Sequence, residues 1–150
     1  MQVQLGSDGA NPGGAVMSAE ENVATISGIY EAFAKGDVAT IQAAVADDVD
    51  WAVDAEPVAP WYGQRRGKDG VASFFADIAS STEVQDFAVE GIGASDTEVF
   101  AFLRFAVRLK STGRQASFHL HHYFRFGADG KIEYYRGSED SAQVEHALAS

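Results

Sequence analysis

The chain contains no cysteine among its 150 residues. This absence excludes a thiol nucleophile and a thiolate metal site, and it removes any dependence of the fold on disulfides. Basic residues are also scarce, because 11 Lys and Arg face 22 Asp and Glu and give a formal net charge of −11. So acidic a surface repels phosphate groups, and we therefore expect neither a nucleic-acid partner nor an anionic membrane partner.

Long apolar runs are missing as well, since none approaches the roughly 20 residues of a membrane-spanning helix. The first residues have neither a basic region nor a continuous apolar region, so they do not form a secretory signal. Residues 1–17 are interpreted as a flexible leader or a remnant of recombinant expression, with Met17 a candidate for the original start. Residues 18–150 are long enough for a single domain with a substantial core. We expect this domain in the cytoplasm.

Three helices are predicted in the first half of the domain. Ser18 and Glu21 have the spacing of a capping box, and the apolar residues that follow recur at helical intervals up to Phe33. The segment Lys35–Asp37 ends this helix and begins a second one. A third helix presents its apolar residues on one face between Val71 and Ile78.

Strands dominate the second half. Alternating side chains predict strands over 49–53, 84–92, 99–110, 114–126 and 131–137, with a short helix over 144–148. Helices followed by an antiparallel meander make an α+β order. We therefore predict an α+β fold in which a curved antiparallel sheet wraps around three N-terminal helices and forms a cone-shaped pocket.

Four segments of the chain resemble one family. They are Phe33–Asp37 between the first two helices, Ala46–Trp51 entering the first strand, Trp61–Val71 before and into the third helix, and His122–Phe126 with Asp129–Ile132 in the closing hairpin. The chain is similar to the SnoaL-like branch of the nuclear transport factor 2-like superfamily, which includes ketosteroid isomerase, limonene epoxide hydrolase, scytalone dehydratase and polyketide cyclases. The resemblance implies the cone fold over nearly the whole domain, but this superfamily uses one cone for many reactions and for plain binding.

Residue by residue, the resemblance transfers little of the known catalytic machinery. The base aspartate, second aspartate and tyrosine of ketosteroid isomerase correspond to Val53, His122 and Ile29. Asp54 and Tyr30 lie one position away from two of these, and a strand must bulge before a neighbour can take over a role on the other face. The charged residues of limonene epoxide hydrolase correspond to Phe105, Val107 and Gly137. An epoxide hydrolase of that type is therefore not expected.

His122 is the main candidate for chemistry. Side chains alternate along a strand, so His122 shares an apolar face with Phe118, Leu120 and Phe124, whereas His119 and His121 lie on the other face. An imidazole near neutrality can remove a proton next to a carbonyl and return it. The alternative is a core histidine that is hydrogen-bonded to a neighbour such as Tyr30.

Two kinds of side chain could assist His122. Tyr30 and Tyr135 are candidate hydroxyl donors to a developing oxyanion, although a buried tyrosine with a satisfied hydroxyl is the commoner case. Asp54 could act as a base if it were half-buried against Trp51, and as an exposed loop residue otherwise. The predicted catalytic set is thus His122, Tyr30 and Asp54.

Aromatic and aliphatic residues are predicted to form the pocket walls, namely Trp51, Val53, Tyr62, Phe74, Phe87, Phe105, Phe118, Leu120, Phe124 and Tyr135. Such walls suit a flat, apolar or polycyclic ligand, but they would equally make an ordinary core. His119 and His121 point the same way from their strand, yet no carboxylate is apparent to complete a metal site. We expect no metal and no cofactor.

The outer face of the strand over 99–110 carries Phe100 and Phe102 beside Arg104 and Arg108. We expect a homodimer through this convex sheet face. A small apolar molecule is the expected ligand. Two functions remain open: a cofactor-independent isomerase, cyclase or dehydratase that transfers protons on an apolar carbonyl or polyketide-like substrate, or a non-catalytic ligand-binding module.

Overall fold

The computed structural model describes residues 18–149, so the predicted leader, residues 1–17, lies outside the described residues. The helices and strands follow one another as α1 (Ala19–Lys35), α2 (Val38–Ala44), β1 (Val45–Val53), β2 (Gly63–Arg66), α3 (Gly67–Ser81), β3 (Thr82–Ala94), β4 (Glu98–Leu109), β5 (Gln115–Phe126), β6 (Ile132–Ser138) and α4 (Ser141–Leu148). No helix among these residues is both long and apolar enough to span a membrane.

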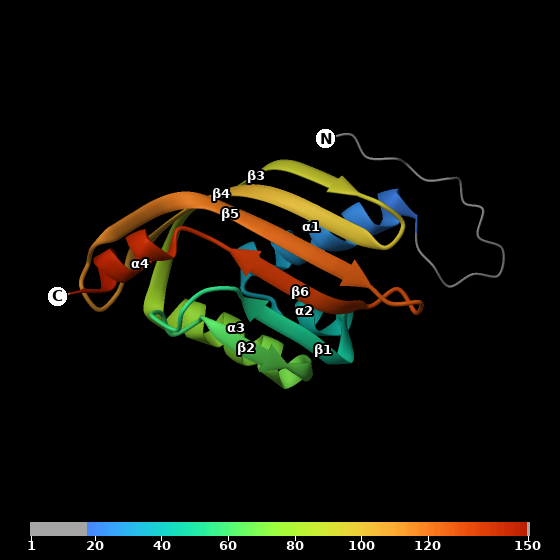
Figure 1. Ribbon diagram of the computed structural model, residues 1–150, viewed down its shortest axis with the longest axis horizontal. Helices are drawn as coiled ribbons and strands as arrows, with labels where there is room; N and C mark the ends of the chain where they lie inside the picture. The colour runs from blue at the N-terminus through green and yellow to red at the C-terminus, as the bar shows by residue number, and fades with distance from the viewer. Residues whose placement is uncertain (1–17, 150) are drawn as a thin grey trace.

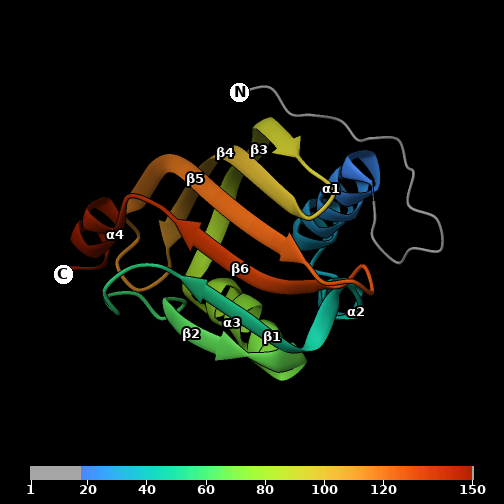
Figure 2. The same cartoon turned by 45° about the vertical axis from the view of Figure 1, so that its right-hand side comes forward.

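Six strands form one bent sheet in the order β2-β1-β6-β5-β4-β3. Figure 1 and Figure 2 show this sheet curving around α1, α2 and α3, with α4 at one end of it near the C-terminus. The predicted α+β class and cone arrangement are therefore confirmed. One feature of the sheet differs from the prediction, because β1 and β6 run parallel to each other. These strands are far apart in the sequence, so no hairpin turn dictates an antiparallel direction.

Strand boundaries also differ from those predicted. β1 begins at Val45 instead of at residue 49, and β3 extends beyond both ends of the predicted 84–92. β2 was not predicted at all. It is an edge strand whose side chains are polar and alternately half-buried and exposed, and it pairs antiparallel with β1. A strand without apolar residues gives no signal in the hydrophobic pattern.

The first helix begins and ends as its sequence predicts. The backbone N–H of Glu21 donates to the Ser18 hydroxyl over 3.0 Å, and the backbone N–H of Ser18 donates to Oε1 of Glu21 over 2.9 Å. Gly36 ends the helix in the left-handed region at φ 72°, a conformation that favours glycine. α1 is therefore capped at both ends by residues close to it in the sequence, independently of its packing against the sheet.

Strand β4, which lies between β5 and the edge strand β3, presents different side chains to the two faces of the sheet. Its residues alternate strictly, so that Val99, Leu103 and Val107 are fully buried while Phe100 and Phe102 are exposed. The buried side chains of β4 and β5 face the three helices and form the core with them. This concave side is where a cavity can form.

Candidate functional site

A small cavity lies inside the cone, between the concave face of the sheet and helices α1 and α3. Its volume is about 60 Å³, whereas pockets for drug-sized ligands measure about 300–1,000 Å³. The predicted wall residues that line it are Trp51, Val53, Phe74, Phe87, Phe105, Leu120, Phe124 and Tyr135. His122 and Tyr30 line it too, so the structure brings most of the predicted site together.

The predicted flat or polycyclic ligand does not fit this volume. The aromatic walls pack against each other instead of leaving a slot between them. Trp51 stacks on Tyr135 with ring centroids 4.1 Å apart and meets Phe74 edge-on at 5.8 Å. The cavity therefore accepts a small group of atoms rather than a ring system.

His122 lies in the cavity wall and is hydrogen-bonded to Tyr30. Nδ1 of His122 and the Tyr30 hydroxyl are 2.8 Å apart. Burial lowers the pKa of His122 to about 3, with a smaller contribution from the neighbouring His121. Burial also raises the pKa of Tyr30, which keeps its hydroxyl protonated. The pair is therefore neutral, and the hydrogen bond matches the alternative interpretation of His122 as a bonded core residue.

Burial of neutral His122 makes the stability of the fold depend on pH. The folded-state pKa lies below the usual 6.5, so the unfolded chain binds the extra proton and stability is lost as pH falls from 6.5 toward 3. We expect His122→Asn to reduce the acid-induced loss in the free energy of unfolding by a few kcal/mol at most. Urea unfolding at several pH values measures this loss. The exposed His146→Asn is the control, and equal pH dependence in wild type and His122→Asn would contradict the prediction.

Glu139 is a site residue that the sequence did not reveal. It follows β6 directly and lines the cavity. Its Oε2 accepts hydrogen bonds from the Tyr62 hydroxyl over 2.7 Å and from Nε1 of Trp61 over 3.2 Å. Burial raises the pKa of Glu139 above the usual 4.5, although the two hydrogen bonds oppose the shift. The cavity thus contains one carboxyl group, held on one side by two donors.

Tyr135 lies in the cavity wall, where its ring contacts those of Trp51 and His122. Burial raises the pKa of Tyr135 well above its usual value, and the nearby Tyr30 and Glu139 raise it further, so the hydroxyl stays protonated. Its hydroxyl rests over Gly137, where a Cβ atom would collide with it. Only glycine at this position leaves the Tyr135 ring where it is. Nε1 of Trp51 is buried and has no hydrogen-bond partner within residues 18–149.

Three predicted site residues do not line the cavity. Asp54 is exposed and lies in a shallow hollow on the convex side, beside Phe100 and Arg136. The end of β1 pairs with β6 without a bulge, so strand alternation turns Asp54 away from the side of Val53. Tyr62 is buried behind the cavity and reaches the site only through its hydroxyl on Glu139. Phe118 is buried farther along β5 and borders an outer hollow instead.

The comparisons with known proteins agree with this fold. A family profile described as a SnoaL-like domain matches residues 26–135. The chain belongs to the SnoaL-like family. No curated protein sequence matches this SnoaL-like domain at a significant level.

Solved structures similar to the SnoaL-like domain include proteins with different assignments. An NTF2-like protein of unknown function from Burkholderia pseudomallei is 24% identical over 86% of this chain and 98% of its own, with a TM-score of 0.78. A candidate polyketide cyclase from Xanthomonas campestris is 19% identical over 87% and 98%, with a TM-score of 0.70. An epoxide hydrolase from M. tuberculosis is 18% identical over 87% and 90%, with a TM-score of 0.67. At these identities the likeness establishes the fold alone.

Residues 18–149 of the SnoaL-like domain contain no cluster of three His, Cys, Asp or Glu side chains that could hold a metal ion. The convex face does carry a carboxylate that the sequence analysis did not find, because Oε1 of Glu90 lies 3.0 Å from Nε2 of His119. The same ring stacks on Phe102 at 4.4 Å. His119 is therefore engaged in a surface contact.

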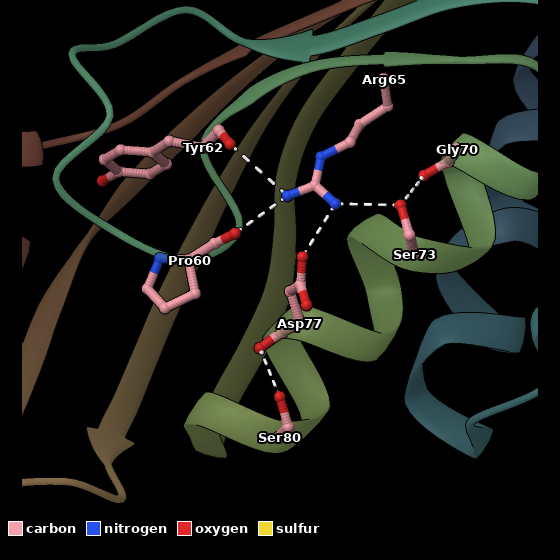
Figure 3. Close-up of polar contacts among 7 residues, drawn as sticks. All are labelled: Pro60, Tyr62, Arg65, Gly70, Ser73, Asp77 and Ser80. Carbon is pink, nitrogen blue, oxygen red and sulfur yellow. Dashed lines mark hydrogen bonds and ion pairs between the residues drawn. The ribbon is translucent and has the colours of Figure 1, made fainter.

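The loop that carries Trp61 and Tyr62 in the SnoaL-like domain is fastened by Arg65, as Figure 3 shows. The Arg65 guanidinium donates to the backbone carbonyls of Pro60 and Tyr62, over 2.9 and 3.4 Å. The first two bonds come from Nη2. The other terminal nitrogen, Nη1, donates to the Ser73 hydroxyl over 2.9 Å and forms an ion pair of 2.8 Å with Asp77 on α3. Arg65 thus connects α3 with both ends of the short segment that holds Glu139.

Arg65→Ala is expected to lower the free energy of unfolding by about 1–3 kcal/mol, because it leaves half-buried hydrogen-bond partners unsatisfied. Urea unfolding followed by circular dichroism measures the loss. The neighbouring Arg66 is exposed and serves as the matched control, for which Arg66→Ala should change stability by about 0.5 kcal/mol or less. Equal effects of the two substitutions would show that the network around Arg65 does not stabilise the loop.

Proposed function

We propose that this SnoaL-like domain is a cofactor-independent enzyme that transfers protons on a small apolar carbonyl compound, as an isomerase, cyclase or dehydratase does. The observation that carries the proposal is Glu139, a half-buried carboxyl group with a raised pKa in a cavity lined mostly by aromatic and aliphatic side chains. Perturbed titratable groups in a cleft are typical of functional sites. A cytoplasmic location is part of the proposal.

The roles follow from the protonation states. Glu139 as carboxylate takes the proton from the carbon next to the carbonyl, and the carbonyl oxygen gains negative charge. The Tyr135 hydroxyl and Nε1–H of Trp51 are the donors available to that oxygen. In a ketone with a neighbouring C=C bond, the electron pair of the broken C–H bond forms a dienolate, and return of the proton to its far carbon shifts the C=C bond and restores the C=O. This isomerisation involves no change in oxidation state, so it balances without a cofactor.

His122 has a different role in this proposal from the one predicted. A buried imidazole whose pKa is lowered to about 3 is a weak base. Its hydrogen bond to Tyr30 instead holds both side chains in place in the cavity wall. The proton therefore moves to Glu139, while His122 and Tyr30 shape the site. Asp54, exposed on the other side of the sheet, takes no part.

Hydrogen–deuterium exchange tests the proposal directly. Small ketones are incubated with the protein in D₂O, and loss of the proton next to the carbonyl is followed by NMR. We expect the protein to accelerate this exchange, because enolisation is the first step of each of the three reactions. Binding of the ketones without any acceleration would favour the alternative, a non-catalytic ligand-binding domain.

A homodimer through the convex sheet face is also part of the proposal. Phe100 is 56% exposed and Phe102 is 39% exposed on β4, and they lie beside the charged Arg104 that pairs with Asp86 and Glu90. Exposed aromatic side chains next to charged groups are typical of interfaces. We expect twice the chain mass in sedimentation at micromolar concentration, and a monomer for Phe102→Glu. The control Ala24→Glu on α1 should remain dimeric, and a monomeric wild type would disprove the interface.

A further inference from the structure

A second hollow lies directly beside the cavity. It is formed by the end of α1, the start of α2, one face of α3 and the start of β3, and its volume is about 510 Å³. We name it the outer chamber and the first hollow the inner cavity. The residues that line both are Phe33, Phe75, Ile78, Thr82 and Phe87. The two spaces therefore share a wall made mostly of side chains.

Three aromatic rings form the centre of this wall, one each from α1, α3 and β3. The Phe33 ring lies 4.9 Å from that of Phe87 and 5.7 Å from that of Phe75, measured between centroids. All three rings are half-buried. Because phenylalanine side chains have no hydrogen bonds to break, they can change rotamer without any movement of the backbone. Rotation of these three rings would open the wall between the two spaces while the backbone stays in place.

The two volumes suit two parts of one molecule. A space of about 60 Å³ admits a carbonyl group with its nearest carbons, whereas about 510 Å³ lies within the range of ordinary ligand pockets. Much of the outer chamber is lined by small apolar residues of α3, Ala72, Ala76 and Ala79. A chain of methylene groups would bury apolar area there without displacing a polar side chain.

Charge restricts the occupant further. The charged residues that line the outer chamber are both acidic, Asp37 and Asp86. Hydrogen bonds from Thr40 lower the pKa of Asp37, and the Arg104 guanidinium lowers that of Asp86, so both are ionised at neutral pH. Asp86 is paired with Arg104, whereas the contacts found for the Asp37 carboxylate within residues 18–149 are hydrogen bonds from Thr40. An anionic ligand would meet this charge and the negative field of the whole chain.

We propose that the outer chamber binds a neutral, unbranched hydrocarbon part of the substrate, whose carbonyl end passes between Phe33, Phe75 and Phe87 into the inner cavity. This inference rests on the proposed function only for what happens at the carbonyl end. The three phenylalanines then determine which substrates enter, and the chamber determines how long they can be.

Binding of a homologous series of ketones tests the inference. Dissociation constants of methyl ketones with four to ten carbons are measured by calorimetry on the full chain. We expect affinity to rise by about three- to four-fold for each added methylene group until the chamber is full. Alkyl carboxylates of the same lengths should bind more weakly than the ketones, because they would meet the acidic lining of the chamber.

A matched pair of variants locates the effect. Ala76 is exposed and lines the outer chamber but not the inner cavity, so Ala76→Trp fills the chamber alone. We expect it to weaken binding of the ten-carbon ketone by about ten-fold or more and to leave the four-carbon ketone unchanged, since only the longer chain loses buried area. Ala24→Trp makes the same substitution on exposed α1 and should leave both affinities unchanged. Circular dichroism confirms that both variants fold.

Several results would overturn the inference. Affinity independent of chain length, no effect of Ala76→Trp, or tighter binding of the carboxylates than of the ketones would each do so. These outcomes are separate from the fate of the proposed chemistry, because binding is measured without turnover. A binding affinity that depends on chain length, without any deuterium exchange, would support the outer chamber as a binding site and rule out the proposed reaction. Deuterium exchange that is insensitive to chain length and to Ala76→Trp would support the proposed reaction and rule out the outer chamber as a binding site.

Discussion

Replacing Glu139 with glutamine is expected to slow deuterium exchange next to the carbonyl by about 10²–10⁴-fold, the usual contribution of general acid–base catalysis. Glutamine has the same shape, and its amide oxygen can still accept from the Tyr62 hydroxyl and from Nε1 of Trp61. It cannot take up a proton. The loss therefore reports the chemistry and not the packing.

The pH dependence gives the same residue a second test. The carboxylate form is the base, so the rate in the wild type should rise as pH increases through the pKa of Glu139, which burial places above the usual 4.5. Burial lowers the pKa of His122 to about 3, so this imidazole should add no second inflection near neutrality. The exposed Glu145→Gln on α4 is the control. Unchanged exchange in Glu139→Gln would exclude Glu139 as the base.

Trp51→Ala is expected to lower the free energy of unfolding by about 3–5 kcal/mol, the range for removing a large buried aromatic side chain. Trp51 is only 2% exposed. Its ring stacks on Tyr135 at 4.1 Å and meets Phe74 and Phe124 edge-on at 5.8 and 6.4 Å. Neighbours that already pack against each other cannot collapse fully into the space left behind. Urea unfolding measures the loss.

Two further variants show whether the loss comes from packing. Trp51→Phe retains a ring against Tyr135 and should cost clearly less than the alanine variant. Phe100→Ala removes an aromatic side chain of which more than half is exposed, and it should change the stability of the monomer by about 0.5 kcal/mol or less. A loss below about 1 kcal/mol for Trp51→Ala would mean that the aromatic wall is loosely packed.

The concave face of the sheet could be predicted from the sequence because alternation is a local property. Val99 and Leu103 are buried and Phe100 and Phe102 are exposed, as their spacing indicates. The same rule placed His122 with Leu120 and Phe124 in the wall of the inner cavity. Helix caps could be predicted for the same reason, since their residues lie within one turn of one another.

Glu139 could not be found this way. It stands in the polar segment Ser138–Asp140 before a short helix, and Asp140 does cap α4 by accepting from the backbone N–H of Gln143 over 3.1 Å. Such a segment is typical of a solvated helix start. The donors to the Glu139 carboxylate, Trp61 and Tyr62, are 78 and 77 residues away. Only the tertiary fold brings them together.

Asp54 is the opposite case, because the sequence predicted it as a catalytic base but the structure places it on the convex side of the sheet, away from the cavity. Its role depended on a bulge near the end of β1, but that part of the strand keeps a regular register against β6. The irregularity in this pairing lies earlier, between Val45 and Asp50. A sequence does not show where a strand will bulge, and one residue of slip decides which side of the sheet a carboxylate occupies.

The parallel direction of β1 and β6 has a consequence for how this molecule can vary. Both strands release the chain at the same rim of the sheet, β1 after Val53 and β6 after Ser138. Insertions or exchanges in the segment from Asp54 to Tyr62, or in the residues before α4, would therefore rebuild one common rim. The turn that joins α1 to α2 would be untouched. Sequence changes at this rim would therefore alter the surroundings of Glu139 without altering the turn between the first two helices.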